Sequence, residues 1–366
     1  MRVLQVTYSY KPIIGGADVY ADDLRRVLEA DGVEFGVLQR PLGPAERTAL
    51  QDSAVITFPR LFAWGNAFWL QPLALPLMRR ALKQWDVLVC HYPNYCVGCL
   101  GHPRLIGLSH GVFWDDRPRS LAARVKRSLA RKAFRQASRY VANDTFFLRE
   151  VGLDISPGQQ PFSEVVPGRW YVPNAVDVQH FCPGPPAPEA EPLRPFVLVP
   201  RNIYVNRGVH LAVEAFARVS QQWPDYRLVV VGHEGQREAV ELAQAAVEKH
   251  GLGERVVFAG GRSRDELVGW YRAAALTLIP SLCGEGTSLA ALESMACGTP
   301  VASTDVGGLP DLPCPAVPPQ PEALAEAINR ALAERDSLAA EQLAAVREGF
   351  NMDLWAAAWR HIVEDW

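Results

Sequence analysis

Short apolar runs alternate with amphipathic stretches along residues 196–305, and this alternation is the clearest pattern in the chain. The apolar runs cover residues 196–200, 227–232, 255–260, 276–280 and 301–305. Stretches with helical spacing of apolar residues lie between them, at 208–221, 236–250, 264–273 and 287–297. Strands that are apolar throughout are buried on both faces. The pattern therefore predicts an α/β fold, with a parallel sheet covered by helices on both sides.

The first half of the chain shows the same pattern less regularly. It begins with an expected strand at 3–7 and an expected helix at 17–30. Further apolar runs lie at 87–91, 105–109 and 140–143. This half is therefore expected to form a second parallel sheet with helices.

A proline-rich stretch without periodicity, 182–192, separates the two halves and is typical of a linker. The tail is rich in aromatic residues at helical spacing, which predicts a helix that packs back on the first domain. The expected organisation is one α/β domain over 1–181, a linker over 182–194, a second α/β domain over 195–348 and a C-terminal helix over 349–366.

Composition limits the classes of protein that fit. An apolar fraction of 49% and a charged fraction of 21% in 366 residues are those of a globular protein. A net charge of −3 lacks the basic excess of a nucleic-acid-binding protein, so we expect no nucleic-acid partner. No secretory h-region and no run of about 18 apolar residues occurs. With seven scattered cysteines, an odd number, these features predict a cytoplasmic location.

The most informative segment runs from 280 to 301, where a strand ends, a turn of small residues follows and a helix begins near Thr287. Free N–H groups and the positive end of the dipole at a helix start favour an anion or hydroxyl groups. Glu285 precedes this helix, and Glu293 lies inside it among apolar residues, where a carboxylate that binds two neighbouring hydroxyls has a reason to be. The alternative is that Glu285 is a helix-end acid and Glu293 is solvated on an outer face.

This segment resembles the donor-binding signature of the family 4 retaining glycosyltransferases of GT-B architecture, the glycosyl transferases group 1. That signature has two glutamates with seven residues between them, as here, then an Ala-x-Gly-x-Pro-Val turn, which 296–301 matches, and a Gly-Gly loop, which 307–308 matches. The resemblance implies two Rossmann-like domains with a donor cleft between them. It also implies that Glu285 contacts the donor sugar, that Glu293 binds the ribose hydroxyls, and that sugar and phosphate are lined by the amides of Gly286, Thr287, Ser288 and Leu289. Thr287 and Ser288 replace the family's usual aromatic residue and glycine, which puts the identity of the sugar in doubt.

Two arginines lie upstream, at a strand end and at the next helix start. Arg201 and the pair Arg207–Gly208 would point into the crevice beyond the carboxyl ends of the strands, where they suit a diphosphate leaving group. The alternative is that both are surface arginines. The family has an arginine and then Lys-Gly at this separation, so Arg207 keeps the charge of the lysine without its compact ammonium.

The first half carries weaker matches. Gly15 and Gly16 join the first strand to the first helix, where glycines let the backbone approach a phosphate, although a lone Gly-Gly is most often only a turn. The resemblance implies that this loop faces the diphosphate and that His110 lies beside the sugar, while a lone histidine is more often structural. The remaining donor-binding matches are Asn174 in a Pro-Asn-x-x-Asp stretch, and Gly232 and Gly260 in loops that frame the base.

No Asp-x-Asp metal clamp occurs in the sequence, so we expect no cofactor and no required metal. The expected reaction transfers a sugar, with retention, from a nucleotide diphosphate sugar (UDP-sugar favoured, GDP-sugar possible) to a hydroxyl of a glycan or lipid-linked acceptor. Cell-surface polysaccharide or glycolipid synthesis is the expected setting. Arg201 and Arg207 would stabilise the leaving diphosphate, Glu285 would orient the sugar and His110 would contact it. The alternatives are a GT-B nucleotide-sugar epimerase and a non-catalytic nucleotide-sugar-binding protein.

Residues 117–139 carry nine Lys or Arg and no acid, with a loose apolar stripe of Leu121, Val125, Leu129 and Phe134. Such a helix suits an anionic membrane surface, on the inner face of the cell membrane, and the alternative is a solvated helix packed on the first domain. Cys90, His91, Cys96, Cys99 and His102 imitate a zinc site, but their spacing is compressed and the first two lie in an expected strand.

Overall fold

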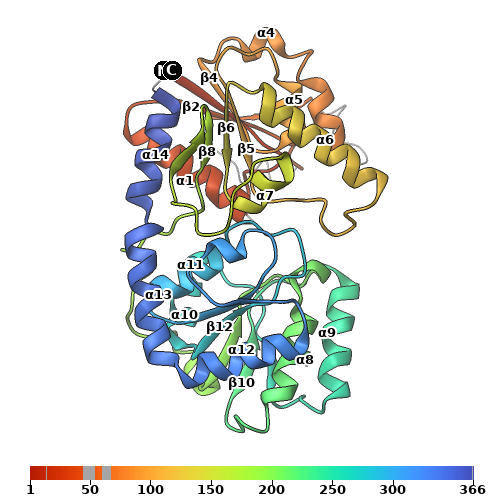
Figure 1. Cartoon of the computed structure of the whole chain (residues 1–366), viewed down its shortest axis with the longest axis vertical. Helices are drawn as coiled ribbons and strands as arrows, with labels where there is room; N and C mark the ends of the chain where they lie inside the picture. Colours follow the sequence, from red (N-terminus) through yellow and green to blue (C-terminus); the bar gives the residue numbers. More distant parts are fainter. Residues whose placement is uncertain (14, 44–53, 60–66, 365) are drawn as a thin grey trace. The chain divides into compact units, whose positions relative to one another are not determined.

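The computed structural model describes residues 1–13, 15–43, 54–59, 67–364 and 366. The chain forms two compact units (Figure 1). The first contains Met1–Ser156, Gln160–Pro173 and Asp353–Trp366, and the second contains Pro157–Gln159 and Asn174–Met352.

The first unit is built on an eight-stranded sheet with the order β3-β2-β1-β4-β5-β6-β8-β7. Neighbouring strands are parallel except for β7 and β8, which form an antiparallel pair at one edge. The strands are β1 (Arg2–Val6), β2 (Glu34–Gln39), β3 (Val55–Thr57), β4 (Val87–Cys90), β5 (Leu105–Ser109), β6 (Arg139–Ala142), β7 (Ser163–Val166) and β8 (Arg169–Tyr171). The helices of this unit are α1 (Gly16–Ala30), α3 (Ala67–Leu70), η2 (Gln71–Ala74), α4 (Arg79–Leu82), α5 (Pro93–Gly98), α6 (Leu121–Gln136), α7 (Thr145–Val151) and α14 (Met352–Glu364).

The tail helix α14 packs by its aromatic face on α1, beside which it lies in Figure 1. Trp359 Nε1 donates a hydrogen bond of 2.8 Å to the Tyr20 hydroxyl, and the Trp355 ring lies edge-on to Tyr20 at 5.1 Å. Arg139, at the start of β6, donates to the carbonyl of Ile362 at 2.5 Å. Residues 353–364 therefore complete the first unit although they follow the second one in the chain.

The second unit is built on a six-stranded parallel sheet with the order β11-β10-β9-β12-β13-β14. Its strands are β9 (Phe196–Val199), β10 (Arg227–Val230), β11 (Val256–Phe258), β12 (Leu276–Ile279), β13 (Val301–Thr304) and β14 (Ala316–Val317). Its helices are η3 (Glu191–Leu193), η4 (Val205–Arg207), α8 (Val209–Val219), α9 (Arg237–Lys249), α10 (Arg264–Ala273), α11 (Leu289–Ala296), η5 (Leu309–Asp311), α12 (Pro321–Ala333) and α13 (Arg335–Gly349). Alternate residues of β9 enter two different cores, one with Val197 and Val199 and the other with Phe196 and Leu198. This two-sided burial is why the strand is apolar throughout.

Both sheets have the strand order of a doubly wound fold, in which ligands bind where the order reverses. The reversal lies between β1 and β4 in the first unit and between β9 and β12 in the second. The loops that follow these four strands are therefore the places where a site is expected.

Several details differ from the sequence-based expectation. The second unit begins at Asn174, ahead of the expected linker at 182–194, because Val176 already pairs with Asn351 and Asn174 bonds to Thr287. Helix α11 begins at Leu289, two residues after the expected start, since Ser288 is its N-cap. The buried face of α6 contains Ala123, Ala130, Ala133 and Phe134, whereas two members of the expected stripe, Leu121 and Val125, are exposed.

Among the described residues, no group of three or more His, Cys, Asp or Glu side chains is arranged to hold a metal ion. In the segment that imitates a zinc site, His91 bonds to Gln5 and His110, and His102 bonds to the carbonyl of Trp85.

Candidate functional site

Arg201 lies just after β9, at the strand reversal of the second sheet, and its side chain is only 10% exposed. Its Nη2 donates to the hydroxyls of Ser281 at 3.4 Å and Ser288 at 3.3 Å. Its Nε is buried and has no hydrogen-bond partner among the described residues. This buried N–H is therefore available to an acceptor from outside the chain.

Glu285 joins the two arginines. Its carboxylate accepts from Arg207 Nη1, lies 3.3 Å from Arg201 Nη2 and accepts from the Ser281 hydroxyl at 2.7 Å. Burial raises the pKa of Glu285, but Arg201, Arg207 and the Ser281 hydrogen bond outweigh it and hold the pKa below its ordinary value. With one carboxylate against two guanidinium groups, the cluster keeps a net positive charge, which favours an anion.

Two glycines allow the backbone to approach closely here. A Cβ on Gly232, after β10, would lie 2.0 Å from the carbonyl oxygen of Arg201, so only glycine lets the two strand ends meet. A Cβ on Gly307, which has φ +59°, would lie 2.0 Å from the carbonyl oxygen of Glu285. The next amide, of Gly308, donates to that carbonyl at 3.1 Å and so holds the backbone of Glu285 in place.

The turn before α11 contains the buried residues Gly286, Thr287 and Ser288, and Leu289 is the first helical residue. The Ser288 hydroxyl accepts from the amide of Ala291 at 3.4 Å, while the first amides of a helix have no partner within the helix. The Thr287 hydroxyl accepts from the amide of Asn174 at 2.8 Å, and the Asn174 side chain donates to the Thr287 carbonyl. Thr287, which stands where the family usually has an aromatic residue, therefore holds Asn174 against the turn before α11.

Glu293 is buried and not solvated on an outer face. Arg264 Nε donates to its Oε1 at 2.7 Å, and the Tyr271 hydroxyl donates to its Oε2 at 3.0 Å. Burial and Glu293 raise the pKa of Tyr271 well above its ordinary value, so the phenol remains a donor.

The loop after β11 is connected to the loop after β10, since the amide of Gly232 donates to the carbonyl of Gly260 at 3.0 Å. Arg262 lies over the Trp270 ring at 5.3 Å and donates to the carbonyls of Ala259 and Gly261, at 2.9 Å each. These contacts fix the backbone around Gly260, where the resemblance places the base.

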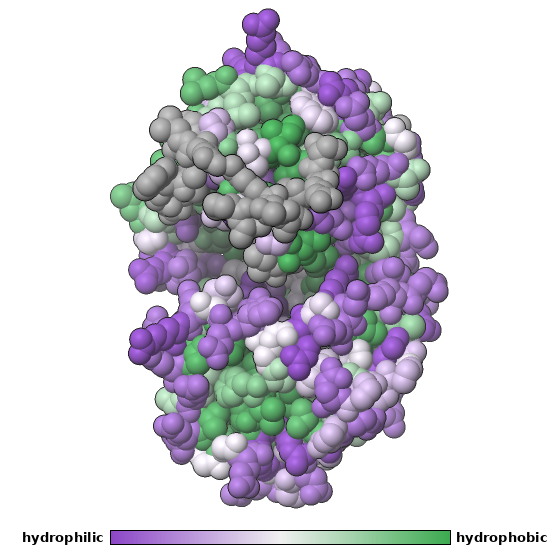
Figure 2. Space-filling view, turned by 180° about the vertical axis from the view of Figure 1, so that it is seen from behind, coloured by the Kyte–Doolittle hydropathy of each residue, from purple (hydrophilic) through white to green (hydrophobic). Residues whose placement is uncertain are grey.

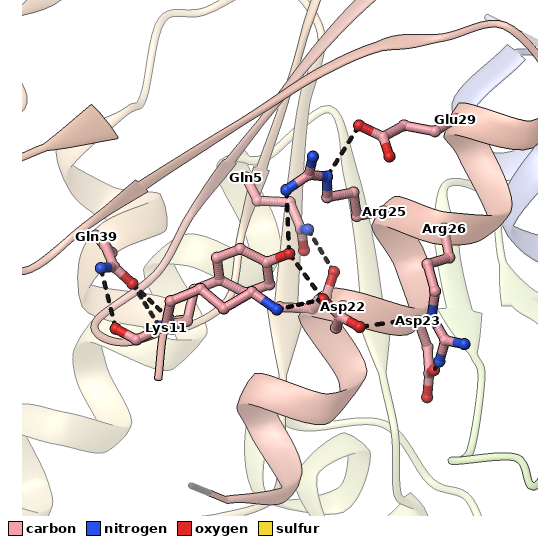
Figure 3. Close-up of polar contacts among 10 residues, drawn as sticks. Gln5, Lys11, Asp22, Asp23, Arg25, Arg26, Glu29 and Gln39 are labelled. Atoms are coloured by element: carbon pink, nitrogen blue, oxygen red, sulfur yellow. Dashed lines mark hydrogen bonds and ion pairs between the residues drawn. The ribbon is translucent and has the colours of Figure 1, made fainter. Parts of the chain in front are cut away.

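In the first unit, the strand reversal carries Gly15 and Gly16, both exposed, at the start of α1. A Cβ on Gly15 would meet no described atom within 4 Å, so packing does not explain this glycine. The preceding loop is held by Gln39, whose Oε1 accepts from the amides of Tyr10 and Lys11 at 2.8 Å each. Lys11 in turn pairs with Asp22 of α1 at 3.0 Å (Figure 3).

His110 follows β5 and is half-buried. Burial lowers its pKa to about 3, so the imidazole is neutral near pH 7. Its Nε2 lies 2.9 Å from Nδ1 of the fully buried His91, which follows β4. His110 therefore cannot act as a cation in this environment.

The structure thus brings Arg201, Arg207, Glu285 and Ser288 into one cluster, while Glu293 has partners of its own. Gly15 and Gly16 follow β1 at the strand reversal of the other unit, and His110 follows β5, the next strand beyond β4, where it contacts His91. The sequence analysis missed four side chains that hold site residues: Ser281, Arg264, Tyr271 and His91. A serine one residue after an apolar strand was a usable signal for Ser281, whereas the partners of Glu293 come from a helix 22 to 29 residues away.

Comparison with known families decides how this cluster is interpreted. The model of glycosyl transferases group 1 matches residues 187–347, and the model of glycosyltransferase family 4 matches residues 14–154. The chain belongs to the family 4 glycosyltransferases. Its GT-B fold is that of the family, with two α/β units on parallel sheets.

Relatives of this glycosyltransferase include enzymes named for inositol-containing substrates. It is 27% identical over 352 residues to D-inositol 3-phosphate glycosyltransferase of Corynebacterium jeikeium, covering 85% of this chain and 82% of the relative. It is 25% identical to one of the subunits of phosphatidylinositol N-acetylglucosaminyltransferase of Arabidopsis thaliana, covering 94% of this chain and 77% of the relative. A Mycobacterium D-inositol 3-phosphate glycosyltransferase is 38% identical, but over 37% of this chain and 31% of the relative.

Solved structures share the fold of this glycosyltransferase along its whole length. Sucrose-phosphate synthase from Thermosynechococcus elongatus matches with a TM-score of 0.79 at 21% identity, covering 100% of this chain and 98% of that one. Anabaena HepE in complex with UDP-glucose matches with a TM-score of 0.76 at 20% identity, covering 100% of both chains.

Proposed function

We propose that this glycosyltransferase transfers a sugar from a nucleotide diphosphate sugar, with UDP as the favoured nucleotide, to a hydroxyl of a glycan or lipid-linked acceptor. The sugar keeps its anomeric configuration, and no metal is required. Arg201 and Arg207 neutralise the diphosphate as the glycosidic bond breaks, and Glu285 orients the sugar. Glu293 binds the ribose hydroxyls, with the amides of Gly286–Leu289 along sugar and phosphate.

The observation that carries this proposal is the unsatisfied Nε of Arg201 at the strand reversal of the second sheet. It belongs to a buried guanidinium in a cluster with excess positive charge, beside the N-terminus of α11. A diphosphate supplies the acceptor oxygens and the negative charge that such a cluster lacks. The solved complex of HepE with UDP-glucose supports the choice of a UDP-sugar as the first donor to test.

The acceptor is proposed from the relatives. Two of them are named for D-inositol 3-phosphate and phosphatidylinositol, so a polyol with vicinal hydroxyls and a phosphate is the first acceptor class to test. Thr287 and Ser288, where the family usually has an aromatic residue and glycine, are the positions at which a different donor sugar would be accommodated.

The test is a panel of UDP- and GDP-sugars, each incubated alone and then with D-inositol 3-phosphate, phosphatidylinositol or a glycan, in EDTA and in added Mg²⁺. We expect slow release of nucleoside diphosphate without acceptor, faster release with it, equal rates in EDTA and Mg²⁺, and a product whose anomeric configuration by NMR equals that of the donor. An isomerised donor would instead establish an epimerase. Tight binding without turnover would establish a nucleotide-sugar-binding protein.

We also propose that the first unit rests on an anionic membrane surface. A shallow hollow along α6 is lined by Arg124, Arg127, Arg131, Lys132 and Arg135. At the start of α6, Leu121 is 74% exposed, and in the η2 region Leu73 and Leu77 are 65% and 81% exposed. Helix α5 contacts both segments, and Figure 2 shows hydrophobic residues on one face of this unit, bordered by hydrophilic ones. Basic residues beside exposed leucines suit lipid head groups and the outer acyl region, at the inner face of the cell membrane.

No described helix is long and apolar enough to cross a bilayer, so attachment by these residues would be peripheral. Membrane attachment is tested by co-sedimentation with two kinds of vesicle. One contains phosphatidylcholine plus phosphatidylglycerol, and the other contains phosphatidylcholine alone. We expect binding only to the anionic vesicles and its loss in Arg124→Glu/Lys132→Glu/Arg135→Glu. The matched control is Arg237→Glu/Arg330→Glu/Arg347→Glu, three exposed arginines of the second unit. Binding that is independent of anionic lipid would contradict the proposal.

A further inference from the structure

Three polar side chains form a line at the strand reversal of the first sheet: Gln5 in β1, His91 after β4 and His110 after β5. Gln5 lies opposite Val89 in the parallel ladder, and His91 is two residues further on, so both project from the same face. Gln5 and His91 are fully buried, and His110 is half-buried. The line therefore leads from the core of the unit to its accessible edge.

The orientation of Gln5 is set by the backbone. Its Nε2 donates to the carbonyl of Ala21 in α1 at 2.7 Å, and because a carbonyl only accepts, the amide nitrogen must face it. The Oε1 of Gln5 then faces Nε2 of His91 and must accept from it. The proton of His91 is therefore on Nε2.

The same reasoning determines which nitrogen of His110 carries the proton. Burial, with a further contribution from His110, lowers the pKa of His91 well below its ordinary value, so the ring is neutral and its Nδ1 carries a lone pair. The Nε2 of His110 lies 2.9 Å from Nδ1 of His91 and must donate its hydrogen to the lone pair there. His110 is itself neutral, which leaves Nδ1 as an acceptor. No partner for this Nδ1 is found among the residues that the structure describes.

We propose that Gln5 and His91 are positioning residues that hold His110 in one tautomer, with the proton on Nε2 and the lone pair on Nδ1. The aromatic neighbours fix the plane of the ring, since Tyr20 lies edge-on to it at 5.0 Å and Tyr92 is tilted against it at 5.8 Å. The assignment of the tautomer concerns the free protein, and its role in turnover rests on the proposed function.

The consequence is a choice of ligand chemistry. A neutral nitrogen with only a lone pair binds the hydrogen of a hydroxyl group and repels the oxygens of a phosphate, which have no proton to donate. His110 would therefore select an alcohol of the sugar or acceptor at this position and disfavour a phosphorylated one. The arginine cluster of the second unit would have the opposite preference, since under the proposed function it binds phosphate.

The test measures the tautomer without substrate. Protein labelled with ¹⁵N-histidine is examined by long-range ¹H–¹⁵N NMR, and His110 is assigned by the loss of its signals in His110→Ala. We expect Nδ1 of His110 in the range of an unprotonated ring nitrogen and Nε2 in that of a protonated one. The reverse assignment in the wild-type protein would overturn the proposal, whatever the outcome of the donor panel.

A matched pair of variants tests the role of His91. Asn places an acceptor where Nδ1 of His91 lies, whereas Gln reaches only the position of Nε2. We expect His91→Asn to keep the tautomer and to hydrolyse UDP-glucose within about threefold of wild type. We expect His91→Gln to give mixed tautomers and to lower kcat by roughly 10- to 100-fold, as for partners that orient a ligand-binding histidine, with little change in KM. An unchanged tautomer in His91→Gln would refute the role of His91.

Discussion

Six strands follow the same order in both units, but the side chains at the point where the order reverses differ in their chemistry. In the second unit, two guanidinium groups and one carboxylate gather beside a helix N-terminus, and a buried N–H lacks a partner among the described residues. In the first unit, the same place holds a glycine turn and two imidazoles kept neutral by burial. The sheet supplies the position of a site in both cases, and the side chains decide what it binds.

The two units also differ in the interactions that orient their ligand-binding side chains. Arg201 and Glu285 are both nearly buried, so the ion pair is weakly screened by solvent and keeps the guanidinium oriented. At its reversal the first unit has the more exposed ion pair of Lys11 and Asp22, together with a hydrogen-bond line that begins at a backbone carbonyl. The arginine cluster of the second unit therefore suits a diphosphate, whereas the neutral His110 of the first unit suits a hydroxyl group.

The largest effect is expected where the charge of the second unit is removed. Arg201→Ala deletes the buried guanidinium that would face the leaving diphosphate, and should lower kcat for sugar transfer by about 100- to 1,000-fold with the fold retained. Steady-state kinetics measures the loss of kcat, and circular dichroism measures whether the fold is retained. Arg194→Ala is the control, since Arg194 is an exposed arginine of the same unit that pairs with Glu191. Wild-type turnover in Arg201→Ala would remove this residue from the mechanism.

A smaller loss is expected at Glu293. Glu293→Ala removes the proposed ribose acceptor, and charged hydrogen bonds of about 1.5–3 kcal/mol predict a loss of roughly 10- to 100-fold in kcat/KM. Glu293→Gln keeps an acceptor for Tyr271 but not the charge, so it separates packing from binding. Glu248→Ala, on the exposed face of α9, is the control. Full activity in Glu293→Ala would assign this residue a purely structural role.

Glu285→Gln should strengthen UDP binding but lower turnover. The carboxylate competes with a diphosphate for Arg207 and Arg201, so its neutralisation is expected to tighten UDP binding by about three- to tenfold while turnover falls. Isothermal titration calorimetry with UDP measures the first effect, and the donor assay measures the second. Weaker UDP binding would mean that Glu285 orients the arginines more than it opposes the ligand.

The smallest effect is a difference in acid sensitivity. Folding lowers the pKa of His91, so below about pH 6.5 the unfolded chain takes up a proton that the folded chain does not. The free energy of unfolding of the first unit should therefore fall as pH drops below 6.5, by about 1 kcal/mol per pH unit from His91. In the second unit the pKa of Glu285 is lowered, so its contribution is lost only below about pH 4.5. Burial also lowers the pKa of His210 in α8, which adds a loss below pH 6.5 there, but the first unit has two such histidines, His91 and His110.

Hydrogen exchange between pH 7 and pH 5.5, corrected for the intrinsic rate, would show this contrast. Peptides from β4 and β5 should lose protection more than peptides from β9 and β12. His91→Asn should flatten the response of the first unit, and Tyr20 and Tyr92 beside His110 remain neutral in this range because burial raises the pKa of both. Equal loss of protection in both units would contradict the assignment.

Much of the second sheet could be predicted because each strand is buried on both faces and reads as a continuous apolar run. Helix 264–273 was predicted with the bounds that it has, and in the structure Ser263 and Glu266 form a capping box at its start. Arg201 and Glu285 were found because strand ends and helix starts are visible in sequence. Their ion pair could not be, because 84 residues separate them and only the parallel pairing of β9 with β12 brings them together.

The first unit was harder to predict for a physical reason. Its β7–β8 pair is antiparallel, with β7 alternating between partly buried and exposed residues, and β3 has only three residues at the edge of the sheet. Neither has the length and two-sided burial of a central parallel strand. Gln5 was the overlooked signal for His91. A polar residue in the middle of a buried apolar strand requires a partner, and His91 supplies it.

The aromatic contact between α1 and α14 affects the order in which the polypeptide folds as it is made. Tyr20 is enclosed by Trp355 and Trp359, which the ribosome synthesises only after residues 174–352. The half that starts first therefore remains without part of its core until the other half has been translated. A chain truncated after residue 352 should hold a folded second unit and a protease-sensitive first one.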